Sequence, residues 1–213
     1  MSENDFYDVV LDLQSLSNLK EGFKIYYSEK ERNKINEYKY EGVCVITAIG
    51  NSNQGKSYIL SKISEFNVPS GYHVNTHGLS ILFPDNLTKE TNKRFIILDT
   101  LGSQNEIKIE KIKEITIDKL MTENFLQDFA VESSHIVIAV VGQLTFQEQK
   151  FLNRIKEICK RKNLFIVHNL MFLEKKDQVE TYIKDTIEAS LFFKLEKQTM
   201  INLGNKKKKK IMN

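Results

Sequence analysis

The chain has 213 residues, of which 41% are hydrophobic and 28% charged, and its formal net charge is +3. This length suits one domain, and the apolar share excludes a wholly disordered chain. No run approaches the roughly 18 apolar residues of a membrane-spanning helix, and the first residues are acidic where a secretion signal is basic. Two cysteines, Cys44 and Cys159, are too few for a disulfide framework or a metal cluster. We therefore expect a cytoplasmic protein.

The positive charge lies at the C-terminal end. Lys206–Lys210 form one run, and without them 26 basic residues stand against 28 acidic ones. The folded body is then slightly acidic, so we expect no nucleic-acid partner. The run itself is typical of a solvated, disordered end, with weak attraction to anionic membranes as the alternative. We predict a lead-in at 1–40, a main domain at 41–205 and a polybasic tail at 206–213.

Short apolar runs alternate with amphipathic stretches along the chain. Val9–Leu11 and Phe23–Tyr27 are predicted as flanking strands. The main strands are predicted at Val43–Ile49, Phe95–Leu98, His135–Val141 and Leu164–Val167, and the helices at Lys56–Phe66, Ile107–Ser133, Thr145–Lys160 and Asp177–Leu191. Ile115–Ile117 is β-branched and could break the second helix. Strands that are apolar throughout are typical of a parallel sheet covered by helices. The pattern predicts an α/β fold with a doubly wound, mostly parallel sheet.

The strongest motif is a glycine-rich loop between the first main strand and its helix. Residues 50–57 match G-x-x-x-x-G-K-[ST], the pattern of a phosphate-binding loop. Glycines let the backbone N–H groups converge on a phosphate, and the helix directs its positive end there. We expect Lys56 to contact the β- and γ-phosphates and Ser57 to bind Mg²⁺. The candidate nucleotide-binding residues are Gly50, Asn51, Ser52, Asn53, Gln54, Gly55, Lys56, Ser57 and the following Tyr58.

A second motif follows the strand at Phe95–Leu98. Asp99 and Gly102 form a D-x-x-G sequence at the exit of this strand. A carboxylate at this position holds Mg²⁺ through water in P-loop enzymes, so Asp99 is a candidate metal-binding residue. Gly102 is a candidate for contact with the γ-phosphate through its N–H.

Between the two motifs, 71–80 is predicted as a mobile segment that supplies a hydroxyl to Mg²⁺ when the γ-phosphate is present. Thr76 is the candidate for both the metal and the catalytic role, with Thr88 and Thr91 as alternatives and a surface-loop threonine as the simpler interpretation.

The residues that would recognise the nucleotide base are less well defined by the sequence. The last main strand runs into His168 and Asn169, both candidate nucleotide-binding residues, but the N-K-x-D pattern of many GTPases is incomplete there. Asn169 is the favoured base-side residue, and Asp177 is an alternative that could equally cap a helix. Guanine and adenine therefore both remain open at this point.

The chain resembles the large P-loop GTPases of the dynamin superfamily, nearest to guanylate-binding proteins and atlastins. The resemblance rests on GNSNQGKSYIL, on THGLSI (Thr76–Ile81), on FIILDTLG and on Phe125–Ile155, which is similar to protist members of that group. It implies a P-loop NTPase fold of the G-domain type, GTP and GDP as ligands, Mg²⁺ as cofactor, hydrolysis, and a homodimer through the nucleotide face.

At two positions that bear on catalysis, the sequence differs from the pattern of known GTPases. Guanylate-binding proteins and atlastins carry an arginine where Asn53 stands, and an arginine acting there raises the rate by about 10³–10⁵-fold. Ser103 stands where many small GTPases have a catalytic glutamine, which leaves Gln104 as the candidate substitute. We expect a slow GTPase unless the chain self-associates. A nucleotide-binding switch or scaffold with little hydrolysis, and an ATPase of related fold, are the alternatives.

Overall fold

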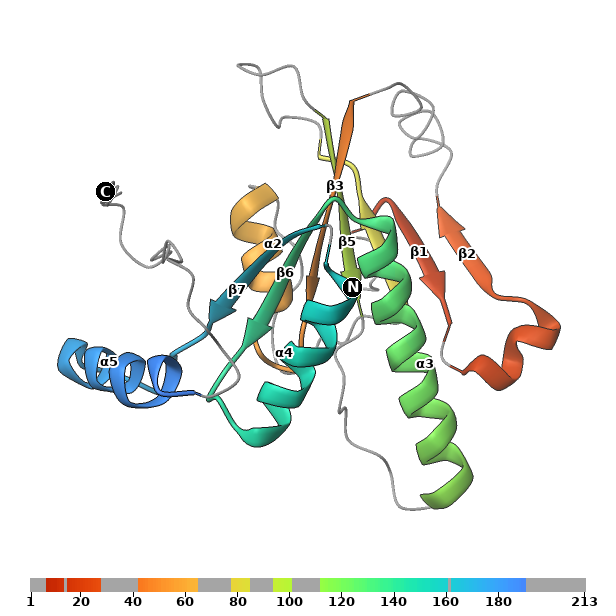
Figure 1. The fold of residues 1–213 in the computed structure, drawn as a ribbon. Coiled ribbons are helices and arrows are strands. Elements are labelled where there is room, and N and C mark those ends of the chain that lie inside the picture. Colours follow the sequence, from red (N-terminus) through yellow and green to blue (C-terminus); the bar gives the residue numbers. More distant parts are fainter. Residues whose placement is uncertain are drawn as a thin grey trace.

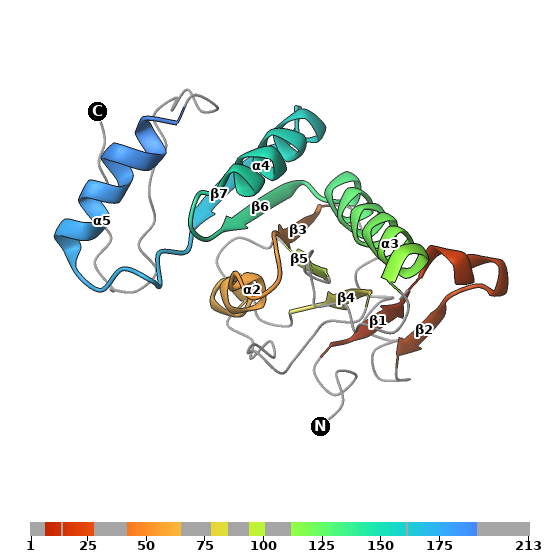
Figure 2. The ribbon, with the colours of Figure 1, turned by 90° about the horizontal axis from the view of Figure 1, so that it is seen from below.

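The computed structural model describes residues 7–13, 15–27, 42–64, 78–84, 94–100, 112–160 and 162–190, which form one sheet with helices on both faces (Figures 1 and 2). The strands are β1 (Val9–Asp12), β2 (Lys24–Tyr27), β3 (Val43–Ile49), β4 (Leu79–Leu82), β5 (Arg94–Thr100), β6 (Ile136–Val141) and β7 (Asn163–His168). The helices are a 3₁₀ turn (Leu16–Glu21), α2 (Lys56–Ser64), α3 (Ile112–Ser133), α4 (Phe146–Ile158), and α5 (Lys176–Tyr182), which continues as a π-helical turn (Ile183–Glu188).

The sheet has seven strands in the order β2-β1-β4-β5-β3-β6-β7. The pairs β5–β3, β3–β6 and β6–β7 are parallel, whereas β4 pairs antiparallel with both β5 and β1, and β1 pairs antiparallel with β2. Five strands, β1 included, therefore run in one direction, and β4 and β2 run against them. This arrangement confirms the predicted α/β class.

Three details differ from the sequence-based expectation. β4 occupies Leu79–Leu82, so its first two residues fall in the segment 71–80 that was predicted to be mobile, because a four-residue strand gives too short a pattern to be recognised. α3 continues through Ile115–Ile117, because the weaker helix propensity of a few β-branched residues is too small a cost to interrupt a helix of 22 residues. β7 is an edge strand with Phe165 52% exposed, so the expectation that it is buried on both faces was wrong.

The two faces of the sheet carry separate apolar clusters. Ile46, Ala48 and Ile138 point to the face covered by α2, where they pack with Ile59 and Leu60. The opposite face, covered by α3 and α4 in Figure 2, packs the next residues along the same strands against these helices. This alternation follows from the period of two in a β-strand. Each core strand is thus buried between helices on both sides.

The connections reverse direction at β3. After β3 the chain passes through α2 to β4 and β5 on one side, and after β5 it crosses through α3 to β6 on the other side. In open α/β sheets, ligands bind at the carboxyl end of the strands at such a switch point. The fold therefore directs attention to the residues that follow β3.

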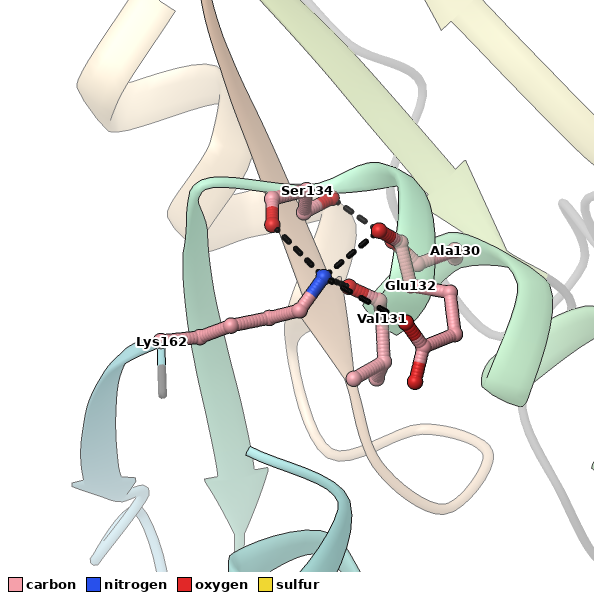
Figure 3. Close-up of polar contacts among 5 residues, drawn as sticks. All are labelled: Ala130, Val131, Glu132, Ser134 and Lys162. Carbon is pink, nitrogen blue, oxygen red and sulfur yellow. Dashed lines mark hydrogen bonds and ion pairs between the residues drawn. The ribbon is translucent and has the colours of Figure 1, made fainter. Parts of the chain in front are cut away.

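The C-terminal end of α3 is closed by a lysine from the turn before β7. Lys162 Nζ donates to the carbonyl oxygens of Val131 (2.8 Å) and Ser134 (3.1 Å) and also to that of Glu132 (Figure 3). A positive charge at a helix C-terminus satisfies the last carbonyls and interacts favourably with the helix dipole. This contact fixes α3 against the sheet. None of the described helices is both long and apolar enough to cross a membrane.

Candidate phosphate-binding site

The loop that follows β3 begins with a glycine that no other residue can replace without strain. Gly50 has a φ of 152°, and a Cβ at this position would lie 2.2 Å from the carbonyl oxygen of Val140 in β6. A side chain would therefore overlap with the backbone of the neighbouring strand. The glycine lets the loop leave β3 in close contact with β6.

The rest of the loop curls back to start α2. Asn53 and Gly55 have positive φ values of 59° and 88°, which asparagine and glycine adopt more readily than other residues. The first bond of α2 runs from the Ile59 N–H to the Gly55 carbonyl at 3.0 Å. The N–H groups before Ile59 therefore have no partner within the helix, and such groups at a helix N-terminus bind anions.

Lys56 is the first residue of α2 and is buried. Its Nζ donates to the Asn51 carbonyl oxygen at 2.9 Å, so the side chain folds back over the loop. Burial lowers the pKa of Lys56, while the nearby carboxylates of Asp99, Glu123 and Glu148 act in the opposite direction. Because Lys56 Nζ donates to a neutral carbonyl oxygen, this contact can be exchanged for a stronger, charge-assisted hydrogen bond to an anionic ligand.

Asp99 lies beside the loop, at the end of β5. Its Oδ2 accepts hydrogen bonds from Ser57 Oγ (2.8 Å) and from the buried hydroxyl of Tyr7 (2.6 Å). Ser57 and Asp99 are the hydroxyl and carboxylate oxygen donors that suit Mg²⁺. Among the described residues, no three His, Cys, Asp or Glu side chains come together as a metal cage. This small donor set fits Mg²⁺, which retains waters and phosphate oxygens in its coordination shell.

Tyr7 is expected to set the Mg²⁺ affinity through Asp99. Tyr7→Phe removes a hydrogen bond that orients the carboxylate, and loss of such an outer-shell partner typically weakens metal binding about 10–100-fold. The Mg²⁺ concentration at the midpoint of nucleotide binding should rise accordingly. Tyr27→Phe is the matched control, because Tyr27 is 52% exposed on the edge strand β2. Equal midpoints in Tyr7→Phe and the control would contradict this role.

A buried carboxylate supports the loop from α4. Glu148 is 4% exposed, and its Oε1 accepts a hydrogen bond from Asn51 Nδ2 at 2.8 Å. Its Oε2 is buried and has no hydrogen-bond partner among the described residues. Burial raises the pKa of Glu148, and the Asn51 hydrogen bond and the Lys56 charge partly oppose this shift. Glu148 thus holds the second residue of the loop by a side-chain contact.

Glu148 is expected to make stability depend on pH. Because its pKa in the folded protein is raised above the ordinary 4.5, its contribution is fully present below that value and is lost as the pH rises through the folded-state pKa. Glu148→Gln keeps an acceptor for Asn51 but does not titrate. In urea unfolding at pH 4 and pH 8, the free energy of unfolding of Glu148→Gln, measured relative to that of the wild type, should therefore be higher at pH 8 than at pH 4. Glu157→Gln, an exposed site on the same helix, should show no such trend, and identical trends in the two variants would refute the assignment.

The base-side residues meet the loop from the end of β7. Asn169 donates from Nδ2 to the Gln54 carbonyl oxygen at 2.9 Å, and its own N–H donates to the Val141 carbonyl at 2.7 Å. His168 precedes it, and burial lowers the pKa of this imidazole, so its neutral form is favoured. The contact between Asn169 and Gln54 joins the predicted base-side position to the phosphate loop.

The structure brings together most of the predicted site. Gly50, Asn51, Lys56, Ser57 and Asp99 meet at the carboxyl ends of β3 and β5, and Asn169 closes the loop from the other side. Tyr58 is 49% exposed beside Lys62, so it lies on the outer surface of α2. Asp177 is exposed in the first turn of α5. Thr76, Thr88, Thr91, Gly102, Ser103, Gln104 and the tail at 206–213 lie outside the described residues.

Three contributors were missed from the sequence. Tyr7 lies in the lead-in, far from any motif, and Glu148 looks like an ordinary charged residue in the first turn of a helix. Gly142 packs against the loop, because a Cβ there would lie 2.2 Å from Gln54 Oε1. The glycine directly after β6 was the one available signal, since glycine at a strand end often permits a close approach.

The order of strand, glycine-rich loop and helix beside a parallel sheet defines a P-loop nucleotide-binding fold of the α/β class. No protein-family model matches the chain. A curated heat shock protein of Dictyostelium discoideum is 25% identical over 209 residues, in an alignment that covers 86% of this chain. The chain spans 30% of the length of that relative.

The similar solved structures include two of Era. A crystal structure of an Aquifex aeolicus Era variant bound to GDP and AlF₄⁻ aligns with a TM-score of 0.48 and 17% identity, covering 69% of this chain and 48% of that one. Era in complex with MgGDPNP and a segment of 16S ribosomal RNA aligns with a TM-score of 0.49 and 19% identity, covering 68% and 47%.

Proposed function

We propose that the chain binds GTP with Mg²⁺ and hydrolyses it to GDP and phosphate. The observation that carries the proposal is the contact between Ser57 Oγ and Asp99 Oδ2 at 2.8 Å, directly beside the buried Lys56. Ser57 of the phosphate-binding loop and the carboxylate of Asp99 are 42 residues apart in sequence, yet they form one site. The resemblance to guanylate-binding proteins and atlastins supports the choice of GTP and of hydrolysis.

Each residue has a distinct role in this proposal. Lys56 and the loop N–H groups bind the β- and γ-phosphates, and Ser57 and Asp99 hold Mg²⁺. The metal, when bound, neutralises charge that develops on the phosphate oxygens. Thr76, Gly102 and Gln104 complete the γ-phosphate side, with Gln104 positioning the attacking water. Asn169 is the base-side residue, and it supports the phosphate loop through its contact with the Gln54 carbonyl oxygen.

A nucleotide switch with little hydrolysis is the second candidate. The observation that favours it is Asn53, which is exposed at the fourth loop position and carries no positive charge. Without an arginine at this position, transition-state charge is less well stabilised. Single-turnover measurements separate the two: rapid phosphate release by the isolated chain supports the GTPase, and tight binding with negligible release supports the switch.

Nucleotide choice is tested by competition. GTP and ATP compete against one labelled guanine nucleotide in the presence of Mg²⁺, with the wild-type chain at fixed concentration. We expect GTP to displace the label at a concentration at least about 10-fold lower than ATP, which corresponds to about 1.4 kcal/mol. A preference for ATP would replace GTP with ATP in the proposal, and equal displacement would remove the preference for guanine. Either result would leave the phosphate site intact.

Self-association and membrane contact extend this proposal. The resemblance supports a homodimer through the nucleotide face, which should form with a GTP analogue and Mg²⁺ and dissociate with GDP. The charge of Lys206–Lys210 supports weak binding to anionic membranes from a cytoplasmic location. Sedimentation with phosphatidylserine vesicles tests it: binding should fall with added salt, and no binding at low salt would remove it.

A further inference from the structure

The outward side of α3 is apolar. Ile117, Leu120, Met121, Phe125 and Phe129 are between 44% and 66% exposed, and these five residues are called the α3 ridge. Phe125 and Phe129 stack on one another with ring centroids 6.4 Å apart. The inward side of the same helix is also apolar at Leu126, Ala130 and Val131, yet it carries the buried polar residues Thr122, Glu123 and Gln127. A helix that is apolar on both sides is typical of burial on both sides.

The helix that carries the ridge is fixed in place. Near its N-terminal half, Asp118 accepts hydrogen bonds from the N–H and the hydroxyl of Ser17. In its second half, Arg154 of α4 donates to Gln127 and Asp128. At its C-terminus, Lys162 binds the last carbonyl oxygens (Figure 3). The ridge is therefore displayed on an anchored helix, and a rigid surface loses little entropy on binding.

The size of the ridge is that of an interaction site. Exposed fractions of 44–66% over five large side chains give an apolar area on the order of 500 Å², the size of patch that marks interaction surfaces on soluble proteins. Two such patches facing each other bury on the order of 1,000 Å², the lower limit for a specific interface. This area predicts a weak dimer that depends on protein concentration.

The arrangement of the ridge suits pairing with itself. Ile117, Met121, Phe125 and Phe129 are spaced four residues apart and form one row, and rows of this spacing interdigitate when two helices cross at about 50°. In a two-fold dimer each residue meets the same region of the other copy, so like charges at the crossing would repel. Asp118 lies on the same side at the edge of the ridge, and its charge is engaged within its own chain, because it accepts hydrogen bonds from the N–H and the hydroxyl of Ser17. Asp128 and Glu132, toward the end of α3, are paired within their own chain with Arg154 and Lys162, which reduces the repulsion between like charges of the two copies.

We propose that the α3 ridge binds a second copy of this chain, with the two α3 helices crossing near Met121. This interface is distinct from a dimer through the nucleotide face, because its residues belong to none of the phosphate contacts described above. It therefore forms without nucleotide or Mg²⁺. If the chain proved not to hydrolyse GTP, this dimer would still be expected to form.

Analytical ultracentrifugation of the full chain in EDTA, over a concentration series, tests the interface. We expect the wild type and Lys56→Ala to dimerise equally and Met121→Glu to dimerise at least about 10-fold more weakly, because a two-fold interface would bury two unpaired carboxylates. Phe146→Glu is the control. It introduces the same charge at an exposed aromatic residue of α4, four residues before Lys150, where an acidic side chain is compatible with the helix. It should dimerise like the wild type.

Two outcomes overturn the proposal. One is a wild type that stays monomeric throughout the series, and the other is equal dimerisation of Met121→Glu and the wild type. Because Met121 is 56% exposed, the substitution should leave the thermal unfolding transition in place. That transition is measured alongside to separate loss of pairing from loss of folding.

Discussion

Lys56→Ala is expected to lower the rate of GTP hydrolysis by about 10²–10³-fold, as is typical when a residue that stabilises transition-state charge is removed. Lys56 is buried at the start of α2 and bound to the Asn51 carbonyl, so it is already positioned within the loop. Phosphate release measured at saturating GTP and Mg²⁺ gives the effect on kcat, and nucleotide titration gives the effect on affinity.

The control for Lys56→Ala separates function from folding. Lys62→Ala changes an exposed lysine of the same helix and should leave turnover unchanged. Because burial lowers the pKa of Lys56, its charge is costly in the folded protein, so Lys56→Ala should not lower the free energy of unfolding. Equal phosphate release from the wild type and Lys56→Ala would remove the proposed role.

Gly50→Ala is expected to destabilise the fold by more than about 3 kcal/mol, because overlap with a backbone atom adds to the strain of a positive φ. The Cβ would lie 2.2 Å from the Val140 carbonyl oxygen, and both atoms belong to the core of the sheet. Relief would require β3 and β6 to separate. Urea unfolding of both proteins gives the difference directly.

Gly42→Ala is the matched control for this prediction. Gly42 precedes the same strand and has a φ of 95°, but no neighbouring atom lies within 4 Å of the point that an added Cβ would occupy. The variant should therefore lose only about 1 kcal/mol through backbone strain. The difference between the two variants measures the steric contribution. Equal losses at Gly50 and Gly42 would mean that β3 and β6 do not approach as closely as described.

Local patterns predicted the elements that build the phosphate site. β3, the loop and α2 form one continuous stretch, so the apolar strand, the glycines and the helix period could be recognised together. The position of Asp99 followed from the strand before it, because the carboxyl ends of parallel strands share one edge. Asn169 followed from the end of β7 in the same way.

The remaining features depend on contacts between distant residues. Tyr7 reaches Asp99 across 92 positions of sequence and Glu148 reaches Asn51 across 97, and no local pattern encodes such pairs. β4 was missed because its pairing with β1 and β5, rather than its own sequence, makes it a strand. The α3 ridge was missed because apolar residues at helical spacing are usually buried in the protein's own core.

Titration calorimetry with a non-hydrolysable GTP analogue and Mg²⁺ tests the central claim most directly, because it measures whether residues 50–57 seat a nucleoside triphosphate. The account predicts saturable heat at one nucleotide per chain, with weaker binding by Lys56→Ala. No heat with GTP, ATP or their analogues, from a chain whose thermal unfolding confirms that it is folded, would contradict it.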